Sequence, residues 1–234
     1  KDYAQIIVAI AITVTPFNLR GFSLFQPVCF DIIFWSLIFY FTLKWINNGS
    51  VKYLLLLGLA SGFGLLNKYL IALEIFGLLL ALFLSPYRFI LKNKSFYLSI
   101  LIALLILLPN IIWQVKNAFP VLIHMQALHD SQLVHVNRIS FFTDQLFMGS
   151  LSLLLFIPGI LFLYFSRTMV SFRPLVIASL IVLITLAILR GKSYYTMGLF
   201  PLWIAAGGIY WESRIKRTFF RVLLPCLILL LTYP

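Results

Sequence analysis

The stretch that decides the fold is VKYLLLLGLASGFGLLNKYLIALEIFGLLLALFL, residues 51–84. It is apolar almost throughout, and the polar pair Asn67-Lys68 lies at its middle. A single helix of this length would be about 50 Å long, whereas one crossing of a bilayer needs about 20 residues, or 30 Å. The pattern therefore predicts two membrane-spanning helices, residues 51–66 and 69–84, joined by a tight turn.

The rest of the chain has the same character. Its 234 residues are 62% hydrophobic and 10% charged, against roughly 45–50% and 25% in soluble domains. The mean hydropathy is +1.05. Because so few charges cannot cover the surface of a soluble fold, lipid must surround most side chains. The composition excludes the soluble, disordered and disulfide-rich classes, and it predicts an all-α, polytopic integral membrane protein.

Apolar runs long enough to cross a bilayer occur about nine times. Besides the two above, they are residues 3–19, 28–46, 95–113, 145–165, 174–189, 196–211 and 219–231. One long polar stretch, residues 114–144, interrupts the pattern and contains all three histidines. We predict one transmembrane domain over residues 1–234, with residues 114–144 as an extracytoplasmic loop within it.

Apolar and polar residues interleave in this loop as in an amphipathic helix. The apolar members are Val121, Leu122, Met125, Leu128 and Leu133. Such a helix lies on the membrane surface with its apolar side down. The histidines are five and six residues apart, so on a helix they point to different sides, and no set of three metal ligands emerges.

The charges divide unevenly between the two predicted sides of the membrane. The chain has 18 Lys and Arg against 6 Asp and Glu, a net charge of +12. With nine alternating crossings, 12 basic residues fall on the side of the N-terminus and 6 on the other. The positive-inside rule then makes the N-terminal side cytoplasmic. Topology explains the excess of basic residues, so we predict no nucleic-acid partner.

Six basic residues remain on the outer side, where this rule expects few. They are Arg20, Lys68, Lys116, Arg138, Arg190 and Lys192. Two of them precede a pair of tyrosines in the segment 190–195, and cations beside phenols can hold a phosphate. A headgroup anchor or a snorkelling lysine is the alternative. We predict a site for the phosphate of a lipid-linked donor, with the lipid tail lying between helices. Its predicted members are Lys68, Arg190, Lys192, Tyr194 and Tyr195.

Asp31 lies about one turn, or 6 Å, into the predicted helix 28–46. A carboxylate at this depth must be hydrated, paired or metal-bound. The dipole of the helix also favours an acidic residue near its N-terminus, so a structural role is the alternative. We keep a catalytic role and coordination of a divalent metal as hypotheses for Asp31, and we predict no other cofactor. Glu74 is predicted to be structural, paired with Lys68 or Arg20.

Five blocks occur in order along the chain. They are FQPVCFDIIFW (25–35), LGLASGFGLLNKY (57–69), LPNIIWQVKNAFP (108–120), HMQALHDSQLV (124–134) and LRGKSYYTMGLFP (189–201). Together they resemble bacterial membrane glycosyltransferases of family 39, relatives of the lipid A aminoarabinose transferases and the protein O-mannosyltransferases. The resemblance covers nearly the whole chain.

The resemblance implies an enzyme of the bacterial inner membrane whose active site faces outward. Such an enzyme takes a sugar from a polyprenyl-phosphate carrier, and the sugar and the acceptor stay open. The resemblance also implies that Tyr194 contacts the carrier phosphate and that the catalytic acidic residue lies in an outer loop before residue 1. We therefore expect the chain to be a fragment, cut at both ends and inactive alone. Many members have Thr-Pro-Asp where this chain has Gln26-Pro27-Val28, so the metal requirement stays open.

A polytopic transporter or lipid flippase is the alternative function. Transporters tend to show internal repeats and charges at mid-bilayer, but the halves of this chain show no self-similarity. A purely structural membrane subunit would not need outer cations beside tyrosines. We therefore favour the glycosyltransferase, with a polyprenyl-phosphate-linked sugar and membrane lipids as partners.

Overall fold

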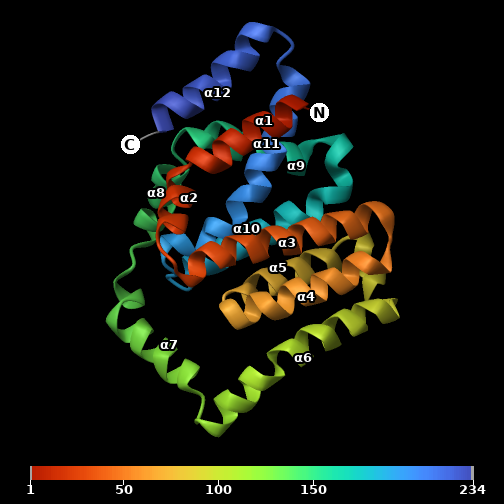
Figure 1. The fold of residues 1–234 in the computed structure, drawn as a ribbon, viewed down its shortest axis with the longest axis vertical. Helices are drawn as coiled ribbons and strands as arrows, with labels where there is room; N and C mark the ends of the chain where they lie inside the picture. The colour runs from red at the N-terminus through yellow and green to blue at the C-terminus, as the bar shows by residue number, and fades with distance from the viewer. Residues whose placement is uncertain (1, 233–234) are drawn as a thin grey trace.

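The computed structural model describes residues 2–232, and within this range every regular element is a helix (Figure 1). The lower half of Figure 1 holds helices that run back and forth side by side. They are α3 (Pro27–Asn48), α4 (Val51–Asn67), α5 (Ile71–Phe83), α6 (Lys94–Lys116) and, packed on α5, α10 (Arg173–Ile188).

The upper half combines both ends of the chain with two helices from its middle. It contains α1 (Asp2–Val14), α2 (Pro16–Ser23), α8 (Arg138–Gly149), α9 (Leu153–Phe165), α11 (Phe200–Arg214) and α12 (Thr218–Thr232). The short 3-10 helices are η1 (Pro86–Lys92), η2 (Leu133–His135), η3 (Ser150–Ser152), η4 (Arg167–Phe172) and η5 (Ser193–Leu199). The all-α architecture predicted from the composition is confirmed for the described residues.

The apolar stretch 51–84 forms two helices, as predicted. The backbone of Lys68 is extended, with φ −160° and ψ 124°, and this ends α4 after Asn67. The amide of Asn67 donates to the carbonyl of Pro27 at 2.9 Å, which ties the turn to the start of α3. The turn is therefore held against a second helix rather than left free.

Nine crossing helices are not found among residues 2–232. Four helical segments are long and apolar enough to cross a membrane, and the number rises to six if each of two bent pairs is one span. The bent pairs are α1 with α2, at 55°, and α5 with η1, at 110°, while α4 and α12 are apolar but shorter. Pro16 explains the first bend, because proline has no N–H for the helical hydrogen bond. The predicted run 196–211 is interrupted as well, since its first part forms η5.

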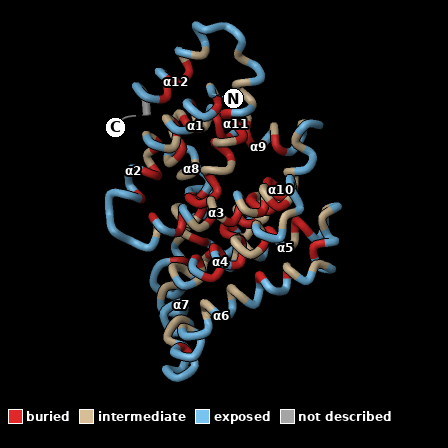
Figure 2. The backbone as a smooth tube through the Cα atoms, turned by 45° about the vertical axis from the view of Figure 1, so that its right-hand side comes forward, coloured by how far each residue is buried: buried red, intermediate tan, exposed pale blue. Residues whose placement is uncertain are grey.

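The polar stretch 114–144 contains the predicted extra helix, α7 (Pro120–Ser131). The neighbouring helices reach into the stretch, since α6 ends at Lys116 and α8 begins at Arg138. No residue of α7 is buried, and Leu122 and Ile123 are 64% and 65% exposed. In Figure 1, α6 and α7 form an arm at the lower edge, and Figure 2 shows α7 mostly exposed.

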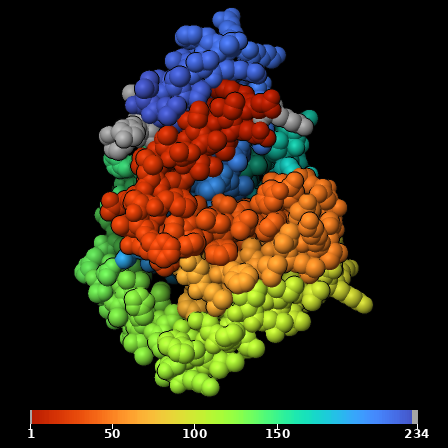
Figure 3. Space-filling view, viewed as in Figure 1, coloured from red at the N-terminus to blue at the C-terminus, as the bar shows by residue number. Residues whose placement is uncertain are grey.

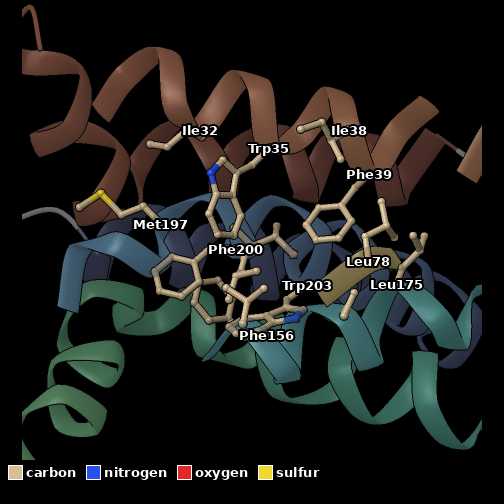
Figure 4. Close-up of a cluster of buried hydrophobic side chains, with 14 of the residues drawn as sticks. Ile32, Trp35, Ile38, Phe39, Leu78, Phe156, Leu175, Met197, Phe200 and Trp203 are labelled. Carbon is tan, nitrogen blue, oxygen red and sulfur yellow. The ribbon is translucent and has the colours of Figure 1, made fainter. Parts of the chain in front are cut away.

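The core lies between α3, α9, α10 and α11, where aromatic side chains meet (Figure 4). Phe200 is fully buried, and its ring centroid is 4.6 Å from that of Phe156. The indole of Trp203 donates to the hydroxyl of Ser179 at 2.9 Å. Figure 2 shows the same region as the most buried part of the chain.

One glycine of the core places η5 directly against α3. A Cβ atom at Gly198 would lie 2.3 Å from the Cγ atom of Trp35, far inside van der Waals contact. No larger residue fits there unless the backbone shifts. The close approach brings the polar residues at the start of η5 next to the N-terminal half of α3.

Candidate functional site

Polar segments that are far apart in sequence gather at one side of the molecule, on the left of Figure 1. They are α2, the turn between α4 and α5, the segment from η2 to α8, and the segment that leads into η5. All of the sequence-predicted site residues lie in or beside these segments, so their surroundings can be compared one by one.

Lys68 forms an ion pair with Asp31 in a largely buried position. The Nζ atom of Lys68 is 3.3 Å from Oδ2 of Asp31, and the two side chains are 21% and 7% exposed. The indole of Trp35 donates to the other oxygen, Oδ1, at 3.1 Å. Both carboxylate oxygens of Asp31 are therefore engaged by donors on α3 and on the α4–α5 turn.

These surroundings do not fit a divalent metal at Asp31. A cation there would stand beside the Lys68 ammonium group and would repel it. Nowhere in residues 2–232 do three His, Cys, Asp or Glu side chains come together closely enough to hold a metal ion. We assign no step to a metal.

Two tyrosines lie beside the same lysine. The Nζ atom of Lys68 is 4.6 Å from the ring centroid of Tyr195 and 5.3 Å from that of Tyr194. The Nζ atom of Lys192 is 6.0 Å from the ring of Tyr194. Contacts of this kind are cation–π interactions. The structure thus brings together four of the five residues that were predicted to bind a phosphate.

Arg190, the fifth, is turned toward the loop instead. Its φ is +54°, a left-handed conformation that a residue with a side chain rarely adopts. Its guanidinium donates to the carbonyl of Val134 at 2.6 Å. A second arginine joins the same two segments in the opposite direction. Arg138 of the loop donates to the carbonyl of Ile188 at 3.4 Å.

A cleft of about 580 Å³ opens between α2, α8 and the segment 192–197. It is lined by Arg20, Gly21, Leu24, Gln26, Val28, Asp144, Phe147, Met148, Lys192, Ser193, Tyr194 and Met197. Two predicted residues, Lys192 and Tyr194, line it, whereas Lys68, Tyr195 and Arg190 do not. The wall therefore carries two cations and one carboxylate.

Two charged residues of this cleft were not among the predicted site residues. Arg20 stood out in the sequence only as an outer cation, and its place in α2 puts it on the cleft wall. Asp144 accepts a hydrogen bond from the hydroxyl of Ser193 at 2.5 Å. No local motif marks Asp144, because its role depends on contact between α8 and η5, which are about 50 residues apart in sequence.

Burial raises the pKa of Tyr195 above its ordinary value, and the neighbouring Tyr194 adds to the effect. Its phenol therefore stays protonated throughout the physiological range and keeps a proton to donate. Tyr195 lies in η5, before α11 begins.

A second cavity, almost wholly apolar, lies on the other side of α2. This groove of about 530 Å³ borders α1, α2, α3 and α11. Its lining includes Phe22, Ile32 and Leu202. Figure 3 shows a hollow between α1 and α3 with the blue atoms of the C-terminal third in its depth. Arg20 and Gly21 of α2 face the cleft, whereas Phe22 faces the groove.

Glu74 does not form the predicted pair with Lys68 or Arg20. Its side chain is fully buried in α5, and both carboxylate oxygens lack a hydrogen-bond partner. Lys68 is paired with Asp31 instead, and Arg20 lies on the wall of the cleft.

The first part of the chain matches a known protein family. Residues 2–113, just under half of the 234 residues, match the family model of dolichyl-phosphate-mannose-protein mannosyltransferases. No curated protein and no solved structure matches the chain. The matched part includes Asp31 and Lys68 and ends before the cleft residues of η5. Together with the apolar helices, the match supports a multi-pass membrane glycosyltransferase.

Proposed function

We propose that the protein transfers a sugar from a polyprenyl-phosphate carrier to an acceptor hydroxyl, on the outer face of a bacterial inner membrane. The family match supports the class of enzyme, since the matched family is that of dolichyl-phosphate-mannose-protein mannosyltransferases. The five sequence blocks described above support a finer assignment to family 39 and its lipid A and protein O-mannosyl relatives. The sugar and the acceptor are left open.

The observation that carries this proposal is a cationic cleft separated by one short helix from an apolar groove. Arg20 and Lys192 line the cleft beside Tyr194. An arginine fork, an ammonium group and a phenol are suitable donors for a phosphate. In this proposal the cleft holds the phosphate of the carrier.

The apolar groove takes the first part of the polyprenyl tail. It shares α2 and α3 with the cleft, and its wall is formed by side chains such as Ile33, Leu37 and Leu202. Because lipid is as apolar as this wall, the tail leaves the bilayer for the groove without a cost of polar burial. A phosphate site beside an apolar groove fits an amphiphilic carrier better than a water-soluble sugar nucleotide.

The proposed reaction is a displacement at the anomeric carbon. The acceptor oxygen forms a bond to this carbon, the bond to the phosphate oxygen breaks, and polyprenyl phosphate leaves with the electron pair. Lys192, Arg20 and the Tyr194 hydroxyl stabilise the negative charge that grows on the leaving phosphate. In this proposal the hydroxyl proton passes to the acidic residue that the resemblance to family 39 implies in an outer loop ahead of residue 1, and not to Asp31.

The lysine of the α4–α5 turn packs against the tyrosines of this site and not against the cleft itself. Lys68 contacts the ring of Tyr194 and that of Tyr195, while its charge is matched by Asp31. We assign Lys68 and Tyr195 to holding Tyr194 in place. Binding of the phosphate by Arg190 stays a prediction, and it requires the guanidinium to leave the carbonyl of Val134.

We also propose the membrane arrangement predicted above, in which helix breaks alternate between the two faces. The cleft then lies on the outer side, and α7 rests on the membrane with exposed residues such as Leu122 and Ile123 toward lipid. The bent and short segments complete the count of nine crossings as tilted or partly protein-buried spans.

Transfer of sugar from the carrier tests the function. The whole protein in nanodiscs is incubated with polyprenyl-phosphate [¹⁴C]mannose and with membrane extract as a source of acceptors. We expect label to move to the acceptor fraction while free polyprenyl phosphate appears. Lys192→Ala should abolish most of this transfer, whereas Lys116→Ala, at an exposed position at the end of α6, should not.

The same experiment in sealed vesicles separates the enzyme from a transporter. If the labelled lipid changes leaflet and stays intact, the protein is a flippase and the proposal is wrong. If label is neither transferred nor moved, a panel of carriers with other sugars decides; failure with every carrier would also overturn the proposal.

Labelling of single cysteines tests the orientation. Native Cys226 is exposed and is replaced first, whereas Cys29 is buried. Cysteines at Gln132 and at Gly49 lie at the two predicted sides. A membrane-impermeant maleimide added outside intact cells should label the first and not the second, and the reverse pattern would place the cleft in the cytoplasm.

A further inference from the structure

Two consecutive residues of α8 hold the segment that carries the cleft's lysine and tyrosine. The hydroxyl of Ser193 donates to Oδ2 of Asp144 at 2.5 Å. The hydroxyl of Thr196 donates to Oε1 of Gln145, also at 2.5 Å. The amide of Gln145 donates in turn to the carbonyl of Ser193, at 3.2 Å.

These three bonds bracket the functional side chains. Ser193 directly follows Lys192, and Thr196 is two residues after Tyr194. Thr196 is fully buried, so its contact to Gln145 is shielded from water. A buried hydrogen bond is strongest where water cannot replace it. The α8 contacts therefore restrict the backbone on both sides of Tyr194.

Besides these contacts, few side-chain hydrogen bonds hold the residues just before Ser193. Lys192 has an unstrained, extended backbone, and its side chain donates to the amide of Gln132, which is exposed. Before it stands Gly191, which lacks a side chain to pack. The packing of Gly198 on Trp35 fixes the end of η5, and the bonds from α8 fix its start at the cleft.

We propose that Asp144 and Gln145 are positioning residues for the phosphate site. They act through Ser193 and Thr196, and they aim Lys192 and Tyr194 into the cleft. This inference rests on the proposed function. Asp144 acts in it as a hydrogen-bond acceptor, because its negative charge would repel a phosphate rather than bind it.

The chemistry of this contact predicts a specific pattern among variants. Asp144→Ala and Ser193→Ala each break the same bond, so the two substitutions together should be no worse than either alone. Asp144→Asn keeps an oxygen acceptor for Ser193. Gln145→Ala removes both the acceptor for the Thr196 hydroxyl and the donor to the carbonyl of Ser193. Gln145→Glu keeps the acceptor for Thr196.

The test measures the affinity of the purified whole protein for farnesyl phosphate, a short polyprenyl phosphate, with farnesol as the control for phosphate dependence. The kcat and KM of sugar transfer are measured in parallel. Thr143→Ala is the matched control, since Thr143 is exposed on the same helix and bonds only to the carbonyl of Ser140.

We expect Asp144→Ala, Ser193→Ala and Gln145→Ala to lower kcat about fivefold to tenfold and to weaken farnesyl phosphate binding several-fold. Farnesol binding should not change. In a Lys192→Ala background, Asp144→Ala should cause a smaller loss than in the parent protein, because only its effect through Tyr194 remains. Asp144→Asn and Thr143→Ala should stay within about twofold of the parent protein.

Three outcomes would overturn the inference. Equal losses in Asp144→Asn and Asp144→Ala would show that the charge of Asp144, and not its hydrogen bond, is responsible. Additive losses in the Ser193→Ala double variant would exclude the shared contact. Normal kcat and binding in all three alanine variants would exclude positioning. Ser193→Ala, which removes one oxygen atom, keeps the test valid if Asp144→Ala does not fold.

A different result of the same experiment would overturn the proposed function. If the parent protein binds farnesol and farnesyl phosphate equally, and Lys192→Ala changes neither, there is no phosphate site. If Lys192→Ala weakens farnesyl phosphate binding while the α8 variants do not, only the positioning role is wrong.

Discussion

The two lysines beside Tyr194 differ in what surrounds their charges. Lys68 is largely buried and paired with the carboxylate of Asp31. Lys192 lines the cleft, and the hydrogen bond of its ammonium group goes to the neutral amide of Gln132. The paired ammonium group is committed to the protein, whereas the charge of the cleft lysine is balanced by no ion pair in the described residues.

This difference separates a structural cation from one that can act on a ligand. A buried ion pair is costly to break, because the remaining charge is left without a partner. An ammonium group beside a solvent-accessible cleft costs little free energy to keep charged. It gains favourable interaction energy when an anion binds. We therefore expect substitutions of Lys68 to affect mainly stability and substitutions of Lys192 to affect mainly turnover.

The largest expected effect is that of Lys68→Ala on stability. It leaves the Asp31 carboxylate buried with the indole of Trp35 as its remaining partner, and we expect the free energy of unfolding to fall by about 3 kcal/mol. Thermal unfolding in detergent measures the loss. Adding Asp31→Asn should restore part of it, because the unpaired charge is then gone; equal stability of Lys68→Ala and Lys116→Ala would contradict the structural role.

The next effect is that of Lys192→Ala on turnover. Removing one donor to a developing negative charge lowers kcat by about a hundredfold. The unfolding temperature should change little, because the side chain is not part of the core. Sugar transfer under saturating donor is the measurement, and normal rates would remove Lys192 from the site.

Arg190→Ala sharpens the comparison within the same segment. Its guanidinium is held by the carbonyl of Val134 and does not line the cleft. Its loss should therefore affect turnover only through the position of the segment, by about twofold to threefold, at the low end for one hydrogen bond. The assay used for Lys192 measures it. A loss as large as that of Lys192→Ala would show that Arg190 reaches the phosphate during the reaction.

The smallest effect concerns pH. Because burial raises the pKa of Tyr195, the phenol ionises first in the unfolded chain, near its ordinary value of about 10. The stability contributed by this group is therefore complete below that pH and decreases as the pH rises past it. Unfolding temperatures between pH 9 and 11 should fall less steeply in Tyr195→Phe than in the parent protein; parallel curves would show that Tyr195 does not contribute.

Hydropathy predicted most helices of the lower half correctly. The run 28–46 became α3, Pro27–Asn48, and the run 95–113 became α6, Lys94–Lys116. The 110° bend between α5 and η1 was not predictable, because the direction of a chain after a turn depends on the surfaces against which it packs. Counting apolar runs therefore overestimated the number of unbroken spans.

The site was predictable only in part. Outer cations beside tyrosines marked Lys192 and Tyr194, and both line the cleft. The position of Arg190 was not predictable, because its partner, Val134, is 56 residues away in sequence and offers only a backbone carbonyl. Asp144 was missed for the same reason, since composition and spacing do not report contacts between distant segments.

The indole of Trp35 gives this membrane protein an optical probe beside the candidate site. Its ring lies against Gly198 at the end of η5, and its N–H donates to Asp31, the partner of Lys68. A shift of η5 or of the ion pair alters the surroundings of this fluorophore directly. With the other four tryptophans replaced by phenylalanine, the emission of Trp35 becomes a label-free signal for occupancy of the cleft.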